Sequence, residues 1–227
     1  MTVPGQPFRW FDVERATQHL RTSDAKLGAL IERAGAFTLA VEPEFSPFES
    51  LLESILYQQL NGKAAATIHA RVMDLFGGSP SPELLLQVPE ERLRAAGVSG
   101  NKTLALKDLA ARTLDGTIPT ENAIRLMEDE EIVRRLTAVR GVGRWTVEML
   151  LIFRLGRADI LPGTDYGIRK GFALTFGRVP KTRALEARDL PPPAALARRG
   201  KRWSPYRTMA SWYLWRACDL AKSATAK

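Results

Sequence analysis

The chain has 227 residues, which is longer than one typical domain of about 100–150 residues, so the sequence predicts one large domain or two small ones. A hydrophobic content of 45% and a charged content of 26% exclude a disordered, collagen-like or coiled-coil chain. The single cysteine, Cys218, excludes an internal disulfide, a cysteine-based zinc site and a four-cysteine iron–sulfur cluster. The formal net charge of +8 at pH 7 favours a polyanionic partner, most often nucleic acid.

Targeting signals are absent from the pattern. The first residues lack the basic region and the long apolar stretch of a signal peptide. The longest apolar run, Met149–Phe153, stops at Arg154 and falls far short of the ~18 residues that cross a bilayer. We therefore expect a cytoplasmic protein with no membrane partner.

Helical signals dominate the chain. The expected helices lie, in chain order, at 24–35 behind a Ser23–Asp24 cap, at 47–56, at 64–76 before two glycines, after Ser81, after Pro89, and at 101–114, 120–127 and 129–139. A short stretch at Phe37–Val41 is an ambiguous strand candidate, and the prolines at 191–193 indicate a loop. The predicted fold class is all-α, with about ten helices joined by short turns.

The most informative segment covers residues 129–151. Two amphipathic helices meet there at a turn that contains Gly141 and Gly143, flanked by Arg140 and Arg144. Backbone N–H groups at a helix N-terminus, together with the helix dipole, favour an anion such as a DNA phosphate. A helix turn whose glycines serve only close packing explains the same pattern, so this motif alone leaves both interpretations open.

Further motifs follow the hairpin along the chain, in an order that resembles a known family. The hairpin at Leu136–Thr146, followed by Leu161–Ile168 with its Leu-Pro-Gly-Thr-Asp sequence, resembles the helix-hairpin-helix and Gly/Pro-Asp signature of base-excision DNA glycosylases. More narrowly, it is similar to the bacterial 3-methyladenine DNA glycosylase II group. Glu53–Leu60 and Arg202–Trp215 extend the resemblance over most of the chain.

This resemblance implies two helical subdomains with an active-site cleft between them. The first would combine residues 1–46 with 162–227, and the second would cover 47–161 and carry the hairpin at about 130–155. Larger members of the group have an additional N-terminal mixed α/β domain, which we do not expect here.

Asp165 is the catalytic carboxylate that the resemblance implies. Cleavage of an N-glycosidic bond passes through an oxocarbenium-like sugar, which a nearby carboxylate stabilises directly or by orienting water. An alkylated base is already cationic and leaves without a general acid. The expected reaction therefore releases 3-methyladenine-type bases flipped out of double-stranded DNA and leaves an abasic site. Taken alone, Thr164–Asp165 also fits a plain helix cap.

Bifunctional members of the superfamily place a lysine two residues after the second hairpin glycine, where this chain has Trp145. We therefore expect a monofunctional enzyme without lyase activity. By resemblance, the base pocket holds Trp145, Met149, Tyr166 and Trp215, since aromatic faces attract a cationic purine. Met149 stands where some relatives have an aromatic residue, which leaves the breadth of substrates open.

Trp215 also stands out by helical geometry. It falls opposite the apolar stripe of the predicted C-terminal helix, close to Thr208 and Ser211. A tryptophan in that position needs another surface to contact. That surface is either the active-site cleft or the other subdomain.

The resemblance also implies several DNA contacts. Gln59 and Leu60 would fill the gap left by the extruded base, although an ordinary helix end before Asn61 fits the same residues. The hairpin contacts to the DNA backbone would come from Arg140, Gly141, Gly143, Arg144 and Thr146. Further phosphate contacts are expected from the basic side chains Lys102, Arg198, Arg199, Lys201 and Arg202.

The family hairpin commonly binds a monovalent cation, Na⁺ or K⁺, through backbone carbonyls, which would correspond to Thr137, Val139 and Val142 here. No other cofactor is expected, and in particular no iron–sulfur cluster.

Two other functions fit part of these features. A non-catalytic helix-hairpin-helix DNA-binding module would share the charge and the hairpin but would not need Asp165 or an outward Trp215. A glycosylase for a neutral lesion such as uracil would need polar groups that face the base edge. We expect a monomer whose partner is double-stranded DNA containing alkylated bases.

Overall fold

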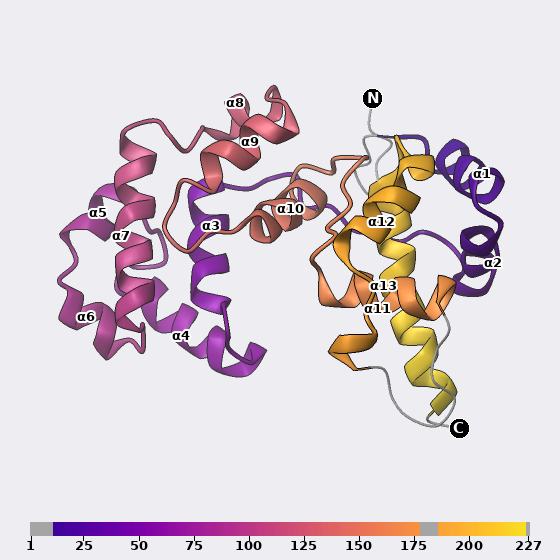
Figure 1. The fold of residues 1–227 in the computed structure, drawn as a ribbon. Helices are drawn as coiled ribbons and strands as arrows, with labels where there is room; N and C mark the ends of the chain where they lie inside the picture. Colours follow the sequence, from indigo (N-terminus) through magenta and orange to yellow (C-terminus); the bar gives the residue numbers. More distant parts are fainter. Residues whose placement is uncertain (1–10, 178–185, 226–227) are drawn as a thin grey trace. The chain divides into compact units, whose positions relative to one another are not determined.

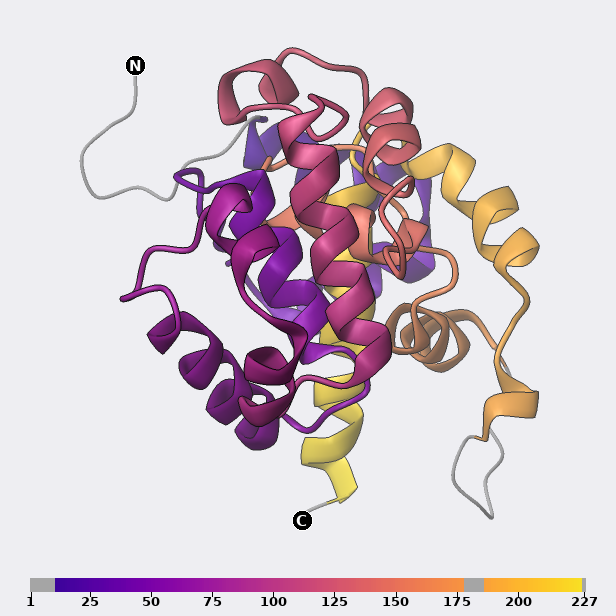
Figure 2. The ribbon, with the colours of Figure 1, turned by 90° about the vertical axis from the view of Figure 1, so that its left-hand side faces the viewer.

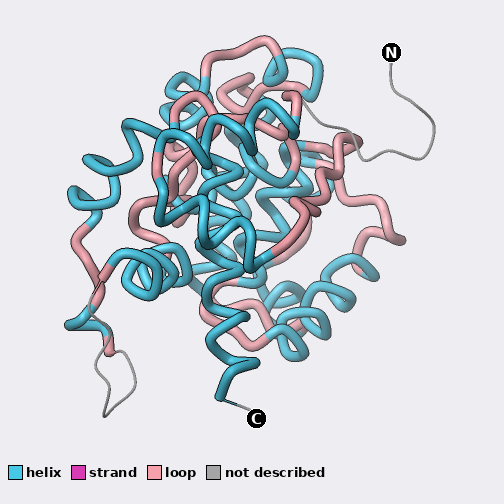
Figure 3. The backbone as a smooth tube through the Cα atoms, turned by 90° about the vertical axis from the view of Figure 1, so that its right-hand side faces the viewer, coloured by secondary structure: helices cyan, strands magenta, loops and turns pink. Residues whose placement is uncertain are grey.

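The computed structural model describes residues 11–177 and 186–225. In these residues thirteen α-helices and two short 3-10 helices make up the regular structure, and no strand occurs (Figures 1 and 3). The predicted all-α class is confirmed, with more helices than expected. The strand candidate at Phe37–Val41 is an irregular segment. Phe37 and Leu39 are buried and the residues beside them are exposed, but the described residues contain no second strand with which this segment could pair. No helix of the described part is long and apolar enough to cross a membrane.

The chain divides into two compact units, Met1–Pro43 with Leu151–Lys227, and Glu44–Leu150. The sequence had placed the second boundary at residue 161 instead. Residues 151–161 belong to the first unit, where the side chain of Thr208 forms hydrogen bonds with their backbone. Its hydroxyl donates a hydrogen bond to the carbonyl of Arg157 at 2.5 Å and accepts one from the N–H of Ile160 at 3.0 Å.

The first unit is built around the C-terminal helix. Its helices are α1 (Val13–Ser23), α2 (Ala25–Ala34), α11 (Tyr166–Phe176), α12 (Pro193–Gly200) and α13 (Arg207–Thr225), with 3-10 helices η1 (Ala187–Asp189) and η2 (Lys201–Trp203). α11 packs closely on α13 (Figure 1). Only a glycine fits at position 171, because a Cβ atom there would lie 1.9 Å from the carbonyl oxygen of Leu214.

Two expectations for this unit need correction. The prolines at 191–193 indicated a loop, but Pro193 is the first residue of α12, because proline suits the first helical turn, whose N–H groups have no partner within the helix. Asp24 does precede α2, yet its side chain makes no capping hydrogen bond. Its buried carboxylate instead accepts hydrogen bonds from Arg199, at 2.7 and 2.8 Å, and from the Trp203 indole, at 3.1 Å.

The second unit surrounds its longest helix. It contains α3 (Pro47–Tyr57), α4 (Gly62–Asp74), α5 (Pro82–Gln87), α6 (Glu90–Ala95), α7 (Gly100–Leu114), α8 (Glu121–Arg125), α9 (Asp129–Leu136) and the first part of α10 (Arg144–Phe153). α7 packs against α3 and α5 (Figure 2). Hydroxyl side chains cap several of these helices, at Ser81 and Thr120 as predicted and also at Ser99, each by accepting the N–H three residues later.

Candidate active site

Asp165 caps α11 and also binds a tryptophan. One carboxylate oxygen, Oδ1, accepts the N–H of Ile168 at 2.7 Å and the indole N–H of Trp215 at 2.9 Å. The prediction that Asp165 caps the helix after it is therefore confirmed. Two donors on one oxygen also fix the orientation of the half-buried carboxylate, which a catalytic role requires.

Trp215 finds its contact surface within its own unit. Its ring stacks on Phe153, with centroids 5.8 Å apart and an interplanar angle of 24°. Gly167 makes room for the indole, because a Cβ atom at position 167 would lie 2.8 Å from Trp215 Cδ1. Trp215, Phe153 and Asp165 thus form one connected group at the N-terminal end of α11.

The face of α13 that carries Trp215 is not a polar, solvated face. Thr208 and Ser211 are buried and hydrogen-bond the segment before α11, with Ser211 Oγ donating to the carbonyl of Ile160 at 3.1 Å. α13 is therefore enclosed on two sides. This is why its pattern of apolar residues describes only half of its packing.

The remaining base-pocket candidates fall in different places. Tyr166 is the first residue of α11, next to Asp165, and 55% of it is exposed. Trp145 and Met149 lie in the second unit, one helical turn apart on α10, with Trp145 46% exposed and Met149 half-buried.

Sequence reasoning missed Phe153 as a member of this group. The signal was present: Trp145, Met149 and Phe153 follow one another at intervals of four residues, which places them along one side of α10. The contact of Phe153 with Trp215, 62 positions later in the chain, had no counterpart in the local pattern.

The glycine hairpin between α9 and α10 is held by its own turn and by a hydrogen bond to helix α7. Gly141 has φ +77°, and the N–H of Val142 donates to the carbonyl of Val139 at 3.1 Å. The N–H of Arg140 donates to the carboxylate of Asp108 on α7 at 2.7 Å. Gly141, Gly143 and the side chain of Arg140 are exposed, as contacts to a DNA backbone require.

Arg144 and Thr146, the two other hairpin candidates, differ from Arg140. The guanidinium of Arg144 binds Glu130 at 2.5 and 3.0 Å and Glu148 at 3.1 Å. The hydrogen bond between Arg144 and Glu130 raises the pKa of the arginine and lowers that of the carboxyl. Thr146 is buried, so only its backbone remains suited to the predicted role.

Two of the basic side chains predicted to touch phosphates have internal partners instead. Lys102 Nζ donates to the carbonyl of Leu56 at 2.6 Å, and burial lowers the pKa of its ammonium. Arg199 is held by the buried Asp24. The side chains of Arg198, Lys201 and Arg202 are exposed.

The predicted insertion residues lie in the turn after α3. Gln59 and Leu60 are both exposed, and Gln59 has a φ of +57°. α3 does end at Tyr57, and Asn61 caps α4 by accepting the N–H of Ala64 at 2.9 Å, so the helix-end interpretation is correct as a description of this turn.

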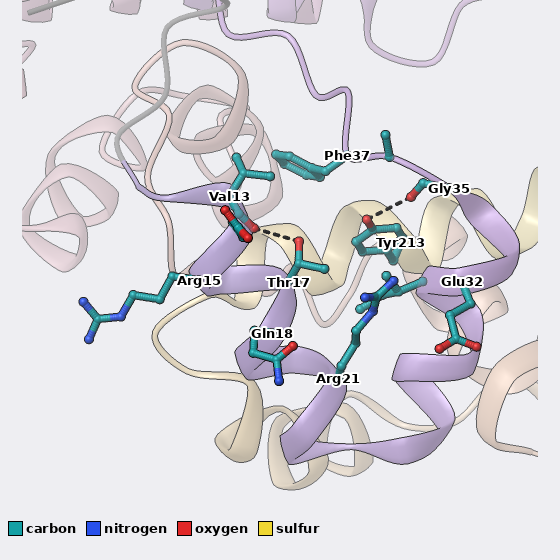
Figure 4. Close-up of a pocket in the computed structure, with 12 residues that line it drawn as sticks. Val13, Arg15, Thr17, Gln18, Arg21, Glu32, Gly35, Phe37 and Tyr213 are labelled. Carbon is teal, nitrogen blue, oxygen red and sulfur yellow. Dashed lines mark hydrogen bonds between the residues drawn. The ribbon is translucent and has the colours of Figure 1, made fainter.

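A hollow with a defined lining lies elsewhere in the first unit. It has a volume of about 860 Å³ and lies against α1, α2 and the segment that follows α2 (Figure 4). Its lining includes Phe37 and Tyr213, whose hydroxyl donates to the carbonyl of Gly35 at 3.1 Å. None of the predicted site residues lines it.

A glycine hairpin between two helices, followed by a capping aspartate, defines the helix-hairpin-helix class of base-excision proteins. The family model described as "HhH-GPD superfamily base excision DNA repair protein" matches residues 52–190, and the chain belongs to this family.

Particular relatives are similar over nearly the whole chain. DNA-3-methyladenine glycosylase 1 of Schizosaccharomyces pombe is 36% identical over 91% of this chain and 88% of that protein. A solved structure of 3-methyladenine DNA glycosylase (Mag1) from the same yeast, in complex with abasic DNA, matches with a TM-score of 0.75 and 36% identity over 91% of this chain and 98% of that one. The DNA-3-methyladenine glycosidase of Bacillus halodurans matches with a TM-score of 0.81 and 34% identity over 95% of each chain.

Proposed function

We propose that this protein is a DNA-3-methyladenine glycosylase that hydrolyses the N-glycosidic bond of alkylated bases flipped out of double-stranded DNA and leaves an abasic site. Family membership and the named relatives support this activity. The observation that carries the proposal is the carboxylate of Asp165, which the N–H of Ile168 and the indole of Trp215 hold in one orientation.

The chemistry asks one carboxylate to stabilise positive charge on the sugar. As the bond to the base breaks, the deoxyribose becomes oxocarbenium-like, and the Asp165 carboxylate stabilises this charge or orients the attacking water. The alkylated base is already cationic, so it departs without a proton from the protein. The fixed position of the carboxylate means that little reorganisation is needed as the charge develops.

Recognition of the base is assigned to aromatic faces. Trp215, backed by Phe153, presents an indole beside the catalytic carboxylate, and a cationic purine is attracted to such a face by about 0.5–2 kcal/mol. Trp145, Met149 and Tyr166 are the other side chains that we assign to base recognition. This set has few groups that could read a neutral base by hydrogen bonds, which supports alkylated bases as the substrates.

Hydrolysis without strand cleavage follows from the residue after the hairpin. Position 145 carries an indole, and an indole cannot form a Schiff base with the opened sugar as a lysine amine does. The proposed enzyme is therefore monofunctional.

Contacts to the DNA outside the base are assigned to two elements. Gln59 and Leu60 would fill the vacated position in the stack, and the hairpin from Arg140 to Thr146, with Gly141, Gly143 and Arg144, would bind the backbone. The carbonyls of Thr137, Val139 and Val142 are hard oxygen donors that suit Na⁺ or K⁺, although Val139 already accepts one hydrogen bond.

The decisive experiment measures bases released from methylated duplex DNA by mass spectrometry. Asp165→Asn keeps a side-chain oxygen as acceptor for the cap and the indole but removes the negative charge, so we expect at least a hundredfold loss of rate with DNA binding retained. Asp219→Asn makes the same substitution at a partly exposed carboxylate of α13 that is ion-paired with Arg216, and it should excise as the wild type does.

The other outcomes separate the competing functions. Release of 3-methyladenine by the wild type alone supports the proposal, and the further products define the breadth of the pocket. If wild type and Asp165→Asn bind duplex DNA but release equally little methylated base, the proposed excision of alkylated bases is wrong. A panel of neutral lesions, uracil first, then separates another glycosylase from a non-catalytic DNA-binding module.

A further inference from the structure

One side chain ties the turn after α3 to the glycine hairpin. Gln58 Nε2 donates a hydrogen bond to the carbonyl oxygen of Gly141 at 3.0 Å, between positions 83 residues apart in the sequence. Both partners lie in the second unit. The contact therefore joins the turn that carries Gln59 to the hairpin proposed to bind the DNA backbone.

Gln59 has an unfavourable backbone conformation. Its φ of +57° is the only positive value at a non-glycine position in the described part of the chain. A residue with a Cβ atom is disfavoured in this left-handed region, and such conformations persist only where the surroundings impose them. The side chain of Gln59 is itself exposed, so its neighbours must impose the conformation.

Helix α7 fixes the elements on both sides of this contact. Lys102 Nζ donates to the carbonyl of Leu56 in the last turn of α3, at 2.6 Å. Asp108 accepts the N–H of Arg140 in the hairpin, at 2.7 Å. With the end of α3 and the hairpin both attached to α7, the hydrogen bond from Gln58 closes the arrangement.

We propose that Gln58 is a positioning residue that couples the insertion turn, residues 58–60, to the hairpin. A DNA backbone bound at the hairpin then lies in a fixed register relative to Gln59, the side chain that enters the stack. The inference rests on the proposed function, because it assigns Gln58 a role in base extrusion by that same enzyme. Extrusion from a pair requires unpairing and unstacking, so the coupling acts on this step rather than on DNA binding.

The test uses Gln58→Met, which keeps the length of the side chain and removes its N–H donor. The probe is a duplex with a single 7-methylguanine, paired with cytosine or placed opposite an abasic spacer, where no base pair has to be broken. Gln87→Met is the matched control, because Gln87 is an exposed residue at the end of α5 in the same unit. Single-turnover rates, the Kd for the duplex and the melting temperature are measured for each variant.

We expect Gln58→Met to lower the rate on the paired lesion about tenfold and the rate opposite the spacer by less than about twofold, with Kd and melting temperature close to wild type. Because Gln58 acts through its neighbour, adding Gln58→Met to Gln59→Ala should change the rate by less than about twofold. Gln87→Met should behave as wild type on both duplexes.

Equal losses on the two duplexes, independent effects of the two substitutions, or an unchanged rate on the paired lesion would each overturn the coupling. These results all require an active wild type. If the wild type releases no base from methylated duplex DNA either, the proposed function fails first and the coupling fails with it. If it releases 3-methyladenine there but no 7-methylguanine, the same comparison of paired and unpaired lesions is made with a base that it releases, so the two failures are distinguished by the wild-type rate.

Discussion

At Asp165, the oxygen that caps α11 also accepts the indole N–H of Trp215. A hydrogen bond to a charged group contributes about 1.5–3 kcal/mol, more than a neutral one, because the carboxylate carries a full charge. The donor is further held by the stack of Trp215 on Phe153. The position of the candidate catalytic carboxylate therefore depends on a residue 50 positions away in the sequence.

Replacing Trp215 by phenylalanine separates the hydrogen bond of its indole N–H to Asp165 from the stacking of its ring on Phe153. Trp215→Phe keeps an aromatic ring against Phe153 but removes the donor to Asp165, so the single-turnover rate should fall about tenfold or more. The melting temperature should change little, because the ring remains.

The control for this prediction is Trp212→Phe on the same helix, whose ring packs against Phe37. That substitution should leave the excision rate within about twofold of wild type. A Trp215→Phe variant that excises as fast as wild type would show that the indole N–H does not position the carboxylate.

Helix contacts in the first unit depend on one buried carboxylate. Asp24 lies before α2, is only 3% exposed, and binds Arg199 on α12 and Trp203 on η2. Burial alone would raise the pKa of this carboxyl. The hydrogen bonds from Arg199 and Trp203, with the arginine charge, outweigh burial and lower the pKa below its ordinary value.

The lowered pKa makes the stability from Asp24 depend on pH. Its contribution is fully present above the unfolded-state pKa of about 3.9 and is lost as the pH falls through the lower folded-state pKa. Asp24→Asn should therefore reduce the free energy of unfolding by about 3 kcal/mol at pH 7, where it breaks a buried ion pair. The difference from wild type should shrink below pH 4.

Urea unfolding at several pH values between 7 and 3 measures this difference. Asp219→Asn on α13 replaces a partly exposed carboxylate and serves as the control, with a small effect at every pH. A destabilisation by Asp24→Asn that stayed constant down to pH 3 would mean that the charge of Asp24 contributes nothing, and that only shape and hydrogen bonding matter.

Local rules predicted the helices well where capping residues mark them. Ser81 and Thr120 cap the helices that they were expected to begin, and the all-α class follows from such signals. Asp24 shows where the rule fails. The same side chain that would cap α2 is taken by Arg199, 175 positions later, and no local pattern contains that partner.

The candidate site, too, could be predicted only as far as local patterns and the order of the motifs reach. Asp165 and Trp215 could be named from the order of motifs, but their hydrogen bond could not. Gln58 looked like the end of a helix, and only the fold brings it to Gly141. Lys107 is similar: its ammonium donates to the carbonyls of Leu85, Leu86 and Val88, 19 to 22 positions earlier, and so caps α5 from another helix.

For the whole molecule, the net charge of +8 indicates an attraction to DNA but does not say which cations bind it. Ion pairs divide the hairpin arginines into two kinds. Arg144 is bound by Glu130 and Glu148, which offset its charge, whereas Arg140 has an exposed side chain next to the exposed glycines. These two residues should therefore contribute differently to binding.

The salt dependence of DNA binding measures this difference. Each phosphate contact contributes about −0.9 to the slope of log Kobs against log salt concentration, because it releases condensed counterions. Arg140→Ala should reduce the magnitude of that slope by about one such contact. Arg144→Ala should reduce the slope by less, because Glu130 and Glu148 offset the charge of Arg144, and it should also lower the melting temperature, because the two carboxylates lose their partner.

Arg33→Ala separates a contact from a mere change in net charge. Arg33 is exposed in the last turn of α2, and its loss removes one positive charge outside the hairpin. If only the net charge mattered, Arg33→Ala and Arg140→Ala would change the slope equally, and the hairpin would lose its assigned role. A decrease confined to Arg140→Ala places a phosphate at the hairpin, since counterions are released only where the protein neutralises the backbone.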